Sequence, residues 1–104
     1  MLAHMVYFSL HEPTPENKRK LLDACHEHLT NHPGQVFYGA GTCASYDREV
    51  NDRDFDVALQ LVFADKATHD AYQVAPRHKQ FIEANKAMWK KVRVFDAEVT
   101  APAK

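Results

Sequence analysis

The spacing between His78 and its apolar neighbours indicates a buried imidazole, which is a candidate for acid–base chemistry. His78 precedes Phe81 and Ile82 by three and four residues, and residues at these spacings lie on one side of a helix. We therefore expect His78 to point into the core and not into solvent. Tyr72 lies six residues earlier, beyond a helix interruption expected at Pro76, and its side chain can reach the same space.

His4 lies in an alternating segment near the N-terminus. Alternate residues of a strand share a face, so His4, Val6 and Phe8 should point to the same side of a sheet. If that side faces the helices, the His4 and His78 imidazoles enter one apolar interior. Titratable groups that are buried together often mark functional sites, so the two histidines and Tyr72 form the candidate site.

Imidazole is the natural general acid or base near neutral pH, because its ordinary pKa is about 6.5. The hypothesis is that a small, mostly apolar carbonyl compound enters the pocket and His78 removes or returns a proton. His4 would hold its partner imidazole or the carbonyl oxygen, and Tyr72 would fix the orientation. The predicted substrate-binding residues are Val6, Phe8, Phe81, Ile82 and Trp89.

The elements that position these side chains follow from periodicity. Alternating apolar residues predict strands over residues 3–10, 35–43, 55–63 and 92–99. Helical spacing predicts a helix from Thr14 to about residue 30, with Thr14 as N-cap and Pro15 first in the helix. Asp65 is expected to cap a short helix to Tyr72 or beyond, followed by a segment over about 77–90 that carries the Trp89 ring.

This order predicts an α+β fold: a ferredoxin-like βαββαβ domain with one antiparallel four-stranded sheet and helices on one face. Residues 1–99 would form the domain and residues 100–104 a flexible C-terminal tail. In the third strand, Phe55 is expected on the same face as Val57.

Both faces of the sheet are expected to be largely apolar, including the face away from the helices. The residues that indicate this on the two faces are Met5, Tyr7, Phe37, Tyr38 and Val62. No further segment remains to cover the face away from the helices, so a second copy of the same sheet is the simplest cover, and we expect a homodimer.

Composition excludes several classes of partner. The 104 residues carry a formal net charge of −1, with a pI of about 6.6, which predicts neither nucleic-acid nor membrane binding. An RNA-recognition motif shares the element order but would need a basic, aromatic third strand. Cys25 and Cys43 are too few for a disulfide framework and are expected to be small buried hydrophobes, typical of a cytoplasmic protein.

No metal or organic cofactor is expected. His28 and His32 are four residues apart, but no HExxH pattern or cysteine pair accompanies them, so we interpret them as a solvated helix face. The acidic segment from Asp47 resembles a calcium loop but has Asp52 and Ala58 where glycine and glutamate are needed.

Several motifs together resemble the stress-responsive A/B-barrel domain family over about residues 2–99. They are His4-Met-Val-Tyr-Phe8, Gly39-Ala-Gly41, Phe55-Asp-Val-Ala-Leu59, Ala71-Tyr72-Gln-Val-Ala-Pro76-Arg-His78, and Trp89 with Val94-Phe95-Asp96. The segment from Ala71 to His78 is the most specific of these motifs. The resemblance implies a dimeric α+β barrel with a pocket in each subunit between helices and sheet.

The resemblance also bears on function. The family includes plant polyketide cyclases, in which two histidines and a tyrosine line the pocket. These residues match His4, His78 and Tyr72 of this sequence. A further pocket tyrosine of these cyclases is absent here, where the first helix reads Asp23-Ala-Cys25-His26. Cyclase- or lyase-like chemistry is thus one reading; the alternatives are a non-catalytic stress-response homodimer with structural histidines and a cofactor-free monooxygenase-like enzyme.

Overall fold

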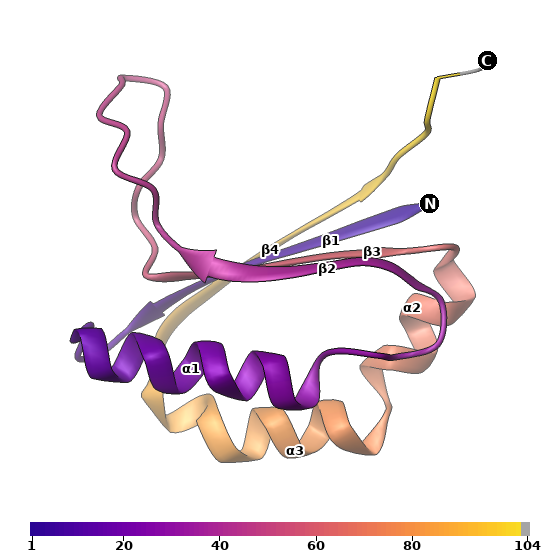
Figure 1. The fold of residues 1–104 in the computed structure, drawn as a ribbon, viewed down its shortest axis with the longest axis horizontal. Coiled ribbons are helices and arrows are strands. Elements are labelled where there is room, and N and C mark those ends of the chain that lie inside the picture. The colour runs from indigo at the N-terminus through magenta and orange to yellow at the C-terminus, as the bar shows by residue number, and fades with distance from the viewer. Residues whose placement is uncertain (103–104) are drawn as a thin grey trace.

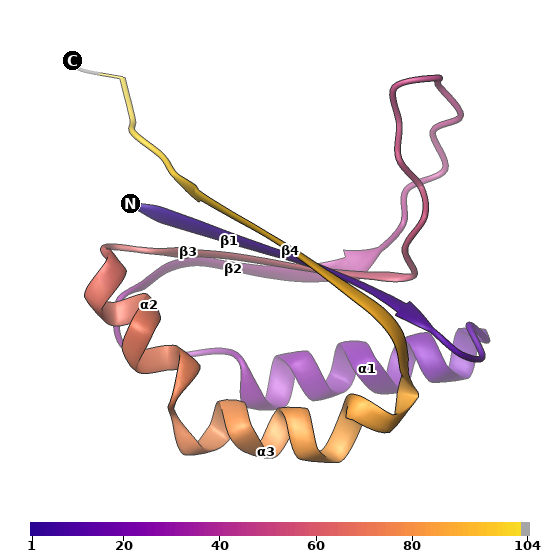
Figure 2. The ribbon, with the colours of Figure 1, turned by 180° about the vertical axis from the view of Figure 1, so that it is seen from behind.

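The chain forms one sheet layer and one helix layer. The computed structural model describes residues 1–102. Its elements are β1 (Leu2–Leu10), α1 (Pro15–His28), β2 (Gln35–Thr42), β3 (Val57–Phe63), α2 (Lys66–Gln73), α3 (Pro76–Asn85), the short 3-10 helix η1 (Lys86–Met88) and β4 (Trp89–Glu98). The antiparallel sheet has the order β2-β3-β1-β4, and the helices cover one face of it (Figures 1 and 2). This is the predicted ferredoxin-like α+β fold.

The helices begin where the sequence predicts. The Thr14 hydroxyl accepts a hydrogen bond from the backbone N–H of Asn17 at 3.1 Å, and Pro15 is the first residue of α1. The Asp65 carboxylate accepts one from the N–H of Thr68 at 2.8 Å and starts α2. Each cap satisfies a backbone donor that the first helical turn leaves free.

The core lies between the helices and the central strands. In β3, every second side chain from Val57 to Phe63 is at most 2% exposed. These side chains pack with the buried face of α1, where Leu21 and Cys25 have no exposed surface. Burial raises the pKa of the Cys25 thiol to about 12, so Cys25 is the small buried hydrophobe that was predicted. Cys43 is only partly buried, because it follows the end of β2 in a loop.

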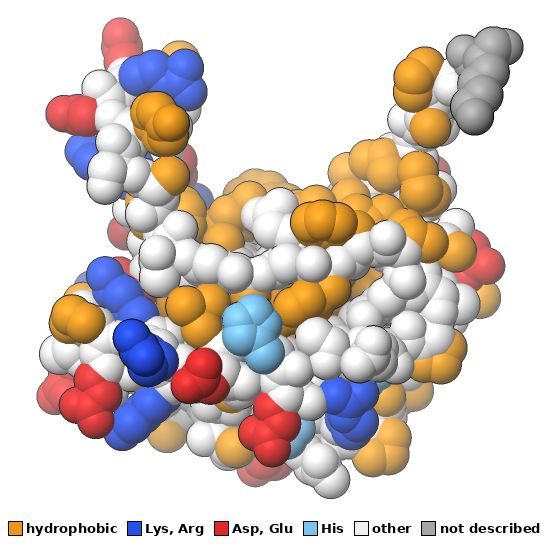
Figure 3. Space-filling view, viewed as in Figure 1, with side chains coloured by type: hydrophobic (Ala, Val, Ile, Leu, Met, Phe, Trp, Pro, Cys, Tyr) orange, Lys and Arg blue, Asp and Glu red, His pale blue; other side chains and the backbone are white. Residues whose placement is uncertain are grey.

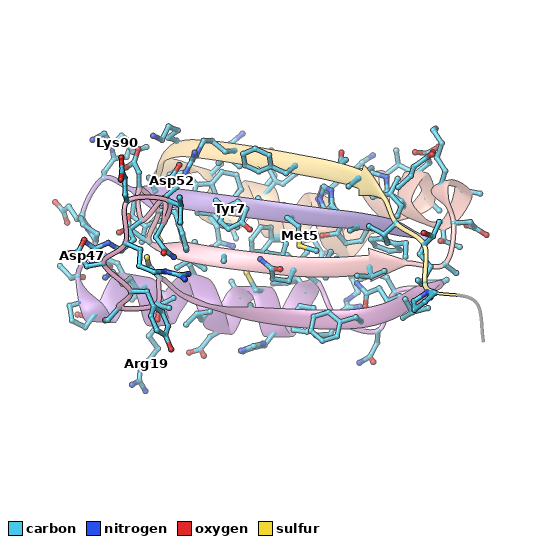
Figure 4. All side chains as sticks on the ribbon, turned by 90° about the horizontal axis from the view of Figure 1, so that it is seen from above. Met5, Tyr7, Arg19, Asp47, Asp52 and Lys90 are labelled. Atoms are coloured by element: carbon cyan, nitrogen blue, oxygen red, sulfur yellow. The ribbon has the colours of Figure 1, made fainter. Side chains whose placement is uncertain are left out.

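The other face of the sheet is open and apolar. Figure 4 looks down on it and shows Met5 and Tyr7 on β1, while Phe37 and Phe95 are both 54% exposed. The segment between β2 and β3 rises beside this face, and apolar side chains gather between it and the C-terminal end of the described chain (Figure 3). We call this surface the open face.

Phe55 lies on the open face, which corrects the predicted third strand. β3 begins at Val57 and not at residue 55, so the alternation does not extend to Phe55. Its ring instead contacts that of Tyr7, with centroids 5.0 Å apart.

Two further expectations were wrong. Trp89 opens β4 and is not helical, because η1 turns the chain before it and its backbone pairs with Leu10. His32 was interpreted as part of a solvated helix face, but α1 ends at His28 and His32 lies beyond it, only 8% exposed. Its Nε2 lies 2.8 Å from the backbone oxygen of His28.

None of the helices within residues 1–102 has both the length and the apolar character needed to cross a lipid bilayer. Residues 100–102 continue from β4 without helix or strand. The predicted flexible tail extends to residue 104, and its last two residues lie outside the described part of the chain.

Candidate functional site

A cavity of about 190 Å³ lies between the sheet and helices α2 and α3. All the residues that the sequence singled out line it: His4, Val6, Phe8, Tyr72, His78, Phe81, Ile82 and Trp89. Sequence reasoning missed its other lining residues, which are Leu29, Leu59, Gln73, Val92 and Val94. The structure thus brings together every side chain of the candidate site, while the roles assigned to them remain predictions.

The junction between α2 and α3 aims Tyr72 and His78 at each other. α2 ends at Gln73, and Pro76 starts α3 two residues after Val74, so the chain changes direction between the two side chains. Their ring centroids lie 4.6 Å apart. Tyr72 is only 2% exposed, so its phenol ring is held in place by the core.

His4 enters the cavity from the sheet. It is 6% exposed, and its Nδ1 lies 2.5 Å from Oδ1 of Asp96. The register of β1 on β4 places these two residues directly opposite each other. A carboxylate bound to one nitrogen of a histidine fixes the ring orientation and favours a hydrogen on that nitrogen. Asp96 therefore leaves the second nitrogen of His4 free for chemistry.

His69 is a third buried histidine in the cluster. It is 9% exposed, and its Nε2 lies 3.2 Å from Nδ1 of His4 and 3.1 Å from Nε2 of Gln73. The sequence offered a signal for it, since His69 precedes Tyr72 by three residues and so shares its helix face. Burial lowers the pKa of His69, and the neighbouring His4 lowers it further, against the opposite effect of Asp96 and Asp70.

The protonation states suit proton transfer. Burial lowers the pKa of His78, and the other histidines nearby lower it further, while the backbone of Gln73 acts in the opposite direction. Its Nδ1 is buried with no hydrogen-bond partner. Burial also raises the pKa of Tyr72. Near neutral pH the imidazole of His78 is thus neutral and able to accept a proton, and the Tyr72 hydroxyl keeps its hydrogen as a donor.

A larger hollow of about 620 Å³ lies on the open face of the sheet, opposite the histidines. Tyr7, Phe55 and Phe95 contribute its aromatic walls, and Arg93 reaches it from β4. Arg93 is tied to the loop before β3 by Asp52, at 3.0 Å, so its charge is already paired. This hollow holds no histidine and coincides with the surface that we expect a second copy to cover.

Among the described residues, one group of side chains brings metal-ligating atoms together. The ligand atoms of His4, His69 and Asp96 all lie within 4.8 Å of one another. They come from β1, α2 and β4, and neither Asp96 nor His69 lines the cavity itself.

Several solved structures share the fold of this chain at low sequence identity. A protein from Arabidopsis thaliana has a TM-score of 0.79 at 18% identity, with 100% of both chains covered. A dimeric ferredoxin-like protein of unknown function from Thermobifida fusca has a TM-score of 0.77 at 17% identity, covering 94% of this chain and 90% of that one. The hydroxynitrile lyase of Passiflora edulis has a TM-score of 0.73 at 18% identity, covering 99% and 96%.

A search of curated proteins found no significant match. A family model described as "Stress responsive A/B Barrel Domain" matches residues 2–99. That range includes all four strands, all the helices and every residue of the candidate site. The chain therefore belongs to the stress responsive A/B barrel domain family.

Proposed function

We propose that this domain binds a small, largely apolar carbonyl compound in the cavity lined by His4, Tyr72 and His78, and that it transfers a proton there. The observation that carries the proposal is the convergence of these three side chains, together with Gln73, on a cavity whose other lining residues are all apolar. Such a combination of apolar walls and a few placed polar groups is typical of small-molecule sites. The unpartnered Nδ1 of His78 supplies a buried polar atom that a ligand could satisfy.

The size of the cavity limits the ligand. Its volume of about 190 Å³ is below the roughly 300 Å³ at which pockets for drug-sized ligands begin. An apolar cavity of about 150 Å³ is nevertheless enough to hold benzene. The ligand is therefore a compound of about one ring. This favours lyase-like proton transfer beside a small carbonyl group over ring closure of a long polyketide chain.

Each of the three side chains has a role. Neutral His78 takes a proton from the carbon next to the carbonyl group, and the electrons of the broken C–H bond form an enolate with its charge on the carbonyl oxygen. With a hydroxynitrile, His78 takes the hydroxyl proton while the carbon–carbon bond to the nitrile breaks, so that cyanide leaves with the electron pair and a carbonyl compound remains. The Tyr72 hydroxyl donates a hydrogen bond to the oxygen on which negative charge develops. His4, oriented by Asp96, presents the lone pair of its second nitrogen and so stabilises the positive charge that His78 gains when it takes the proton. The Passiflora edulis neighbour carries the name of a lyase that acts on hydroxynitriles. Chemistry of that kind needs a base for the hydroxyl proton and a hydrogen bond to the same oxygen.

The proposal includes a homodimer joined through the open face. Phe37 and Phe95, each about half exposed, lie on the same sheet surface as Tyr7, and a contiguous exposed apolar patch marks an interaction surface. The dimeric state of the Thermobifida fusca neighbour supports this arrangement. A two-fold axis would place two open faces against each other and leave the two cavities on the outer sides of the sheets.

Exchange of α-hydrogens tests the enzymatic part. The purified protein is incubated in D₂O with single-ring ketones such as acetophenone, and loss of the α-hydrogen signal is followed by NMR. The wild type should accelerate exchange, and His78→Ala should lose about 10²–10⁴-fold of that acceleration, the usual contribution of a general base. His11→Ala is the control, because His11 is exposed and does not line the cavity.

Three other results would redirect the proposal. Equal exchange by wild type and His78→Ala would remove the base from the mechanism. Binding of the ketones without exchange would leave a non-catalytic ligand-binding homodimer in which the histidines are structural. Oxygen-dependent products would favour the cofactor-free monooxygenase-like alternative.

A further inference from the structure

We propose that His4, His69 and Asp96 form a binding site for one borderline divalent transition metal ion, such as Zn²⁺, in each chain. Two imidazole nitrogens and one carboxylate oxygen are a ligand set that such ions prefer. The site lies behind His4 as seen from the cavity. The site shares His4 with the proposed function, but its test needs no carbonyl compound, so the two proposals can fail separately.

The distances suit a common ion. Ligands that each lie about 2.0–2.1 Å from a tetrahedral Zn²⁺ are separated from one another by roughly 3.3 Å. The two histidine nitrogens, at 3.2 Å, already have this separation. The carboxylate oxygen of Asp96 is too close to His4 at 2.5 Å and would have to move outward. Its side chain is 45% exposed, so a small rotation is open to it.

Asp96 and Gln73 hydrogen-bond the two histidine nitrogens in the metal-free protein, and the close contact between these two nitrogens remains in addition. His4 has one hydrogen to offer from Nδ1, but both the Asp96 oxygen and His69 Nε2 lie within reach of it. His69 Nε2 in turn has one lone pair, which the Gln73 amide also approaches at 3.1 Å. A cation in the centre accepts all these lone pairs at once. The Gln73 amide oxygen would then take the fourth position, since its oxygen and nitrogen exchange by a half turn.

The second nitrogen of His69 fits the same assignment. Its Nδ1 faces a carboxylate oxygen of Asp70 at 3.7 Å, which a small rotation of the exposed Asp70 side chain would bring within hydrogen-bond distance. Histidine ligands commonly direct their remaining N–H to a carboxylate, which fixes the tautomer and leaves the other nitrogen free to bind metal. The side chains of His4 and His69 are only 7% and 11% exposed, so both rings are already held in place before an ion arrives.

Calorimetric titration of the purified chain with Zn²⁺, after treatment with a chelator, tests the site. One ion should bind per chain. Asp96→Asn and His69→Ala should each weaken this binding by more than about 100-fold, because loss of a direct ligand exceeds the 10–100-fold cost of losing an outer partner. Asp96→Asn alters an exposed side chain and so should fold even if His69→Ala does not. His11→Ala removes an exposed histidine as the matched control and should bind as the wild type does.

X-ray absorption of the Zn²⁺ form supplies a second readout, with two imidazoles and oxygen expected in the first shell. Since the three ligands come from β1, α2 and β4, Zn²⁺ should also raise the thermal midpoint of the wild type and not that of Asp96→Asn. The proposal is overturned if the wild type binds no Zn²⁺, or if His69→Ala and Asp96→Asn bind it as tightly as His11→Ala does.

Discussion

Phe95→Asp should convert the proposed homodimer to a monomer without unfolding the domain. Phe95 lies on the open face with its ring 5.8 Å from that of Tyr7, and 54% of its surface remains exposed. A phenylalanine contributes about 200 Å² of surface, so about 110 Å² is left for a partner to cover. At about 25 cal/mol per Å², that burial stabilises the dimer by about 2.7 kcal/mol per protomer.

Two-fold symmetry doubles the effect. Both copies lose the same contact, so the dimer loses about 5 kcal/mol, which raises the dissociation constant by about 10⁴-fold. The carboxylates add a further unfavourable term because each would be buried in the interface without a partner. The domain itself should keep its fold, since the helix-side core does not include Phe95.

Sedimentation velocity over a range of concentrations measures the effect. The wild type should sediment as a dimer and Phe95→Asp as a monomer at the same concentrations. Val74→Asp is the control, because Val74 is 65% exposed at the end of α2, in the helix layer on the opposite side of the sheet, and should leave the dimer intact. A wild-type monomer at all concentrations, or an unchanged dissociation constant for Phe95→Asp, would refute the reasoning.

Three further changes test the site and its supports. Tyr72→Phe keeps the packed ring, so urea unfolding should show a loss of less than about 1 kcal/mol while ketone exchange falls about 10²-fold. Since burial lowers the pKa of His78 from 6.5, the unfolded chain takes up a proton first as the pH falls. The free energy of unfolding should therefore decrease below about pH 6.5, and less so in His78→Gln. The Arg77 guanidinium donates to the backbone oxygens of Thr30, at 2.7 Å, and Glu27, at 2.5 Å, so Arg77→Ala should cost about 1–3 kcal/mol in urea unfolding; no measurable loss would contradict this role.

Local patterns in the sequence predicted much of the fold and the lining of the cavity. The cap residues Thr14 and Asp65 act on groups within three residues, so their effect is visible without tertiary structure. The alternation that starts at His4 and the helical spacing after His78 likewise depend only on neighbours. Because both patterns pointed inward, the sequence placed the two imidazoles in one interior.

The parts that failed depend on contacts between distant segments. Trp89 continued a helical apolar stripe, but a single 3-10 turn and pairing with Leu10 made it the first residue of β4. Asp96 could not be linked to His4 because the register of β4 on β1 is set by the whole sheet. His32 was misjudged for a similar reason, since it is the packing of the chain after α1 against Tyr72 that buries it.

The most direct test of the central claim is to locate the binding site of a small carbonyl compound on the protein. The protein, labelled for NMR, is titrated with benzaldehyde, and contacts between ligand and protein hydrogens are measured by nuclear Overhauser effects. The account predicts contacts to His78, Tyr72 and Phe81, all of which line the smaller cavity. Contacts to Tyr7 and Phe95 in the open-face hollow instead, or no binding at millimolar ligand, would contradict it.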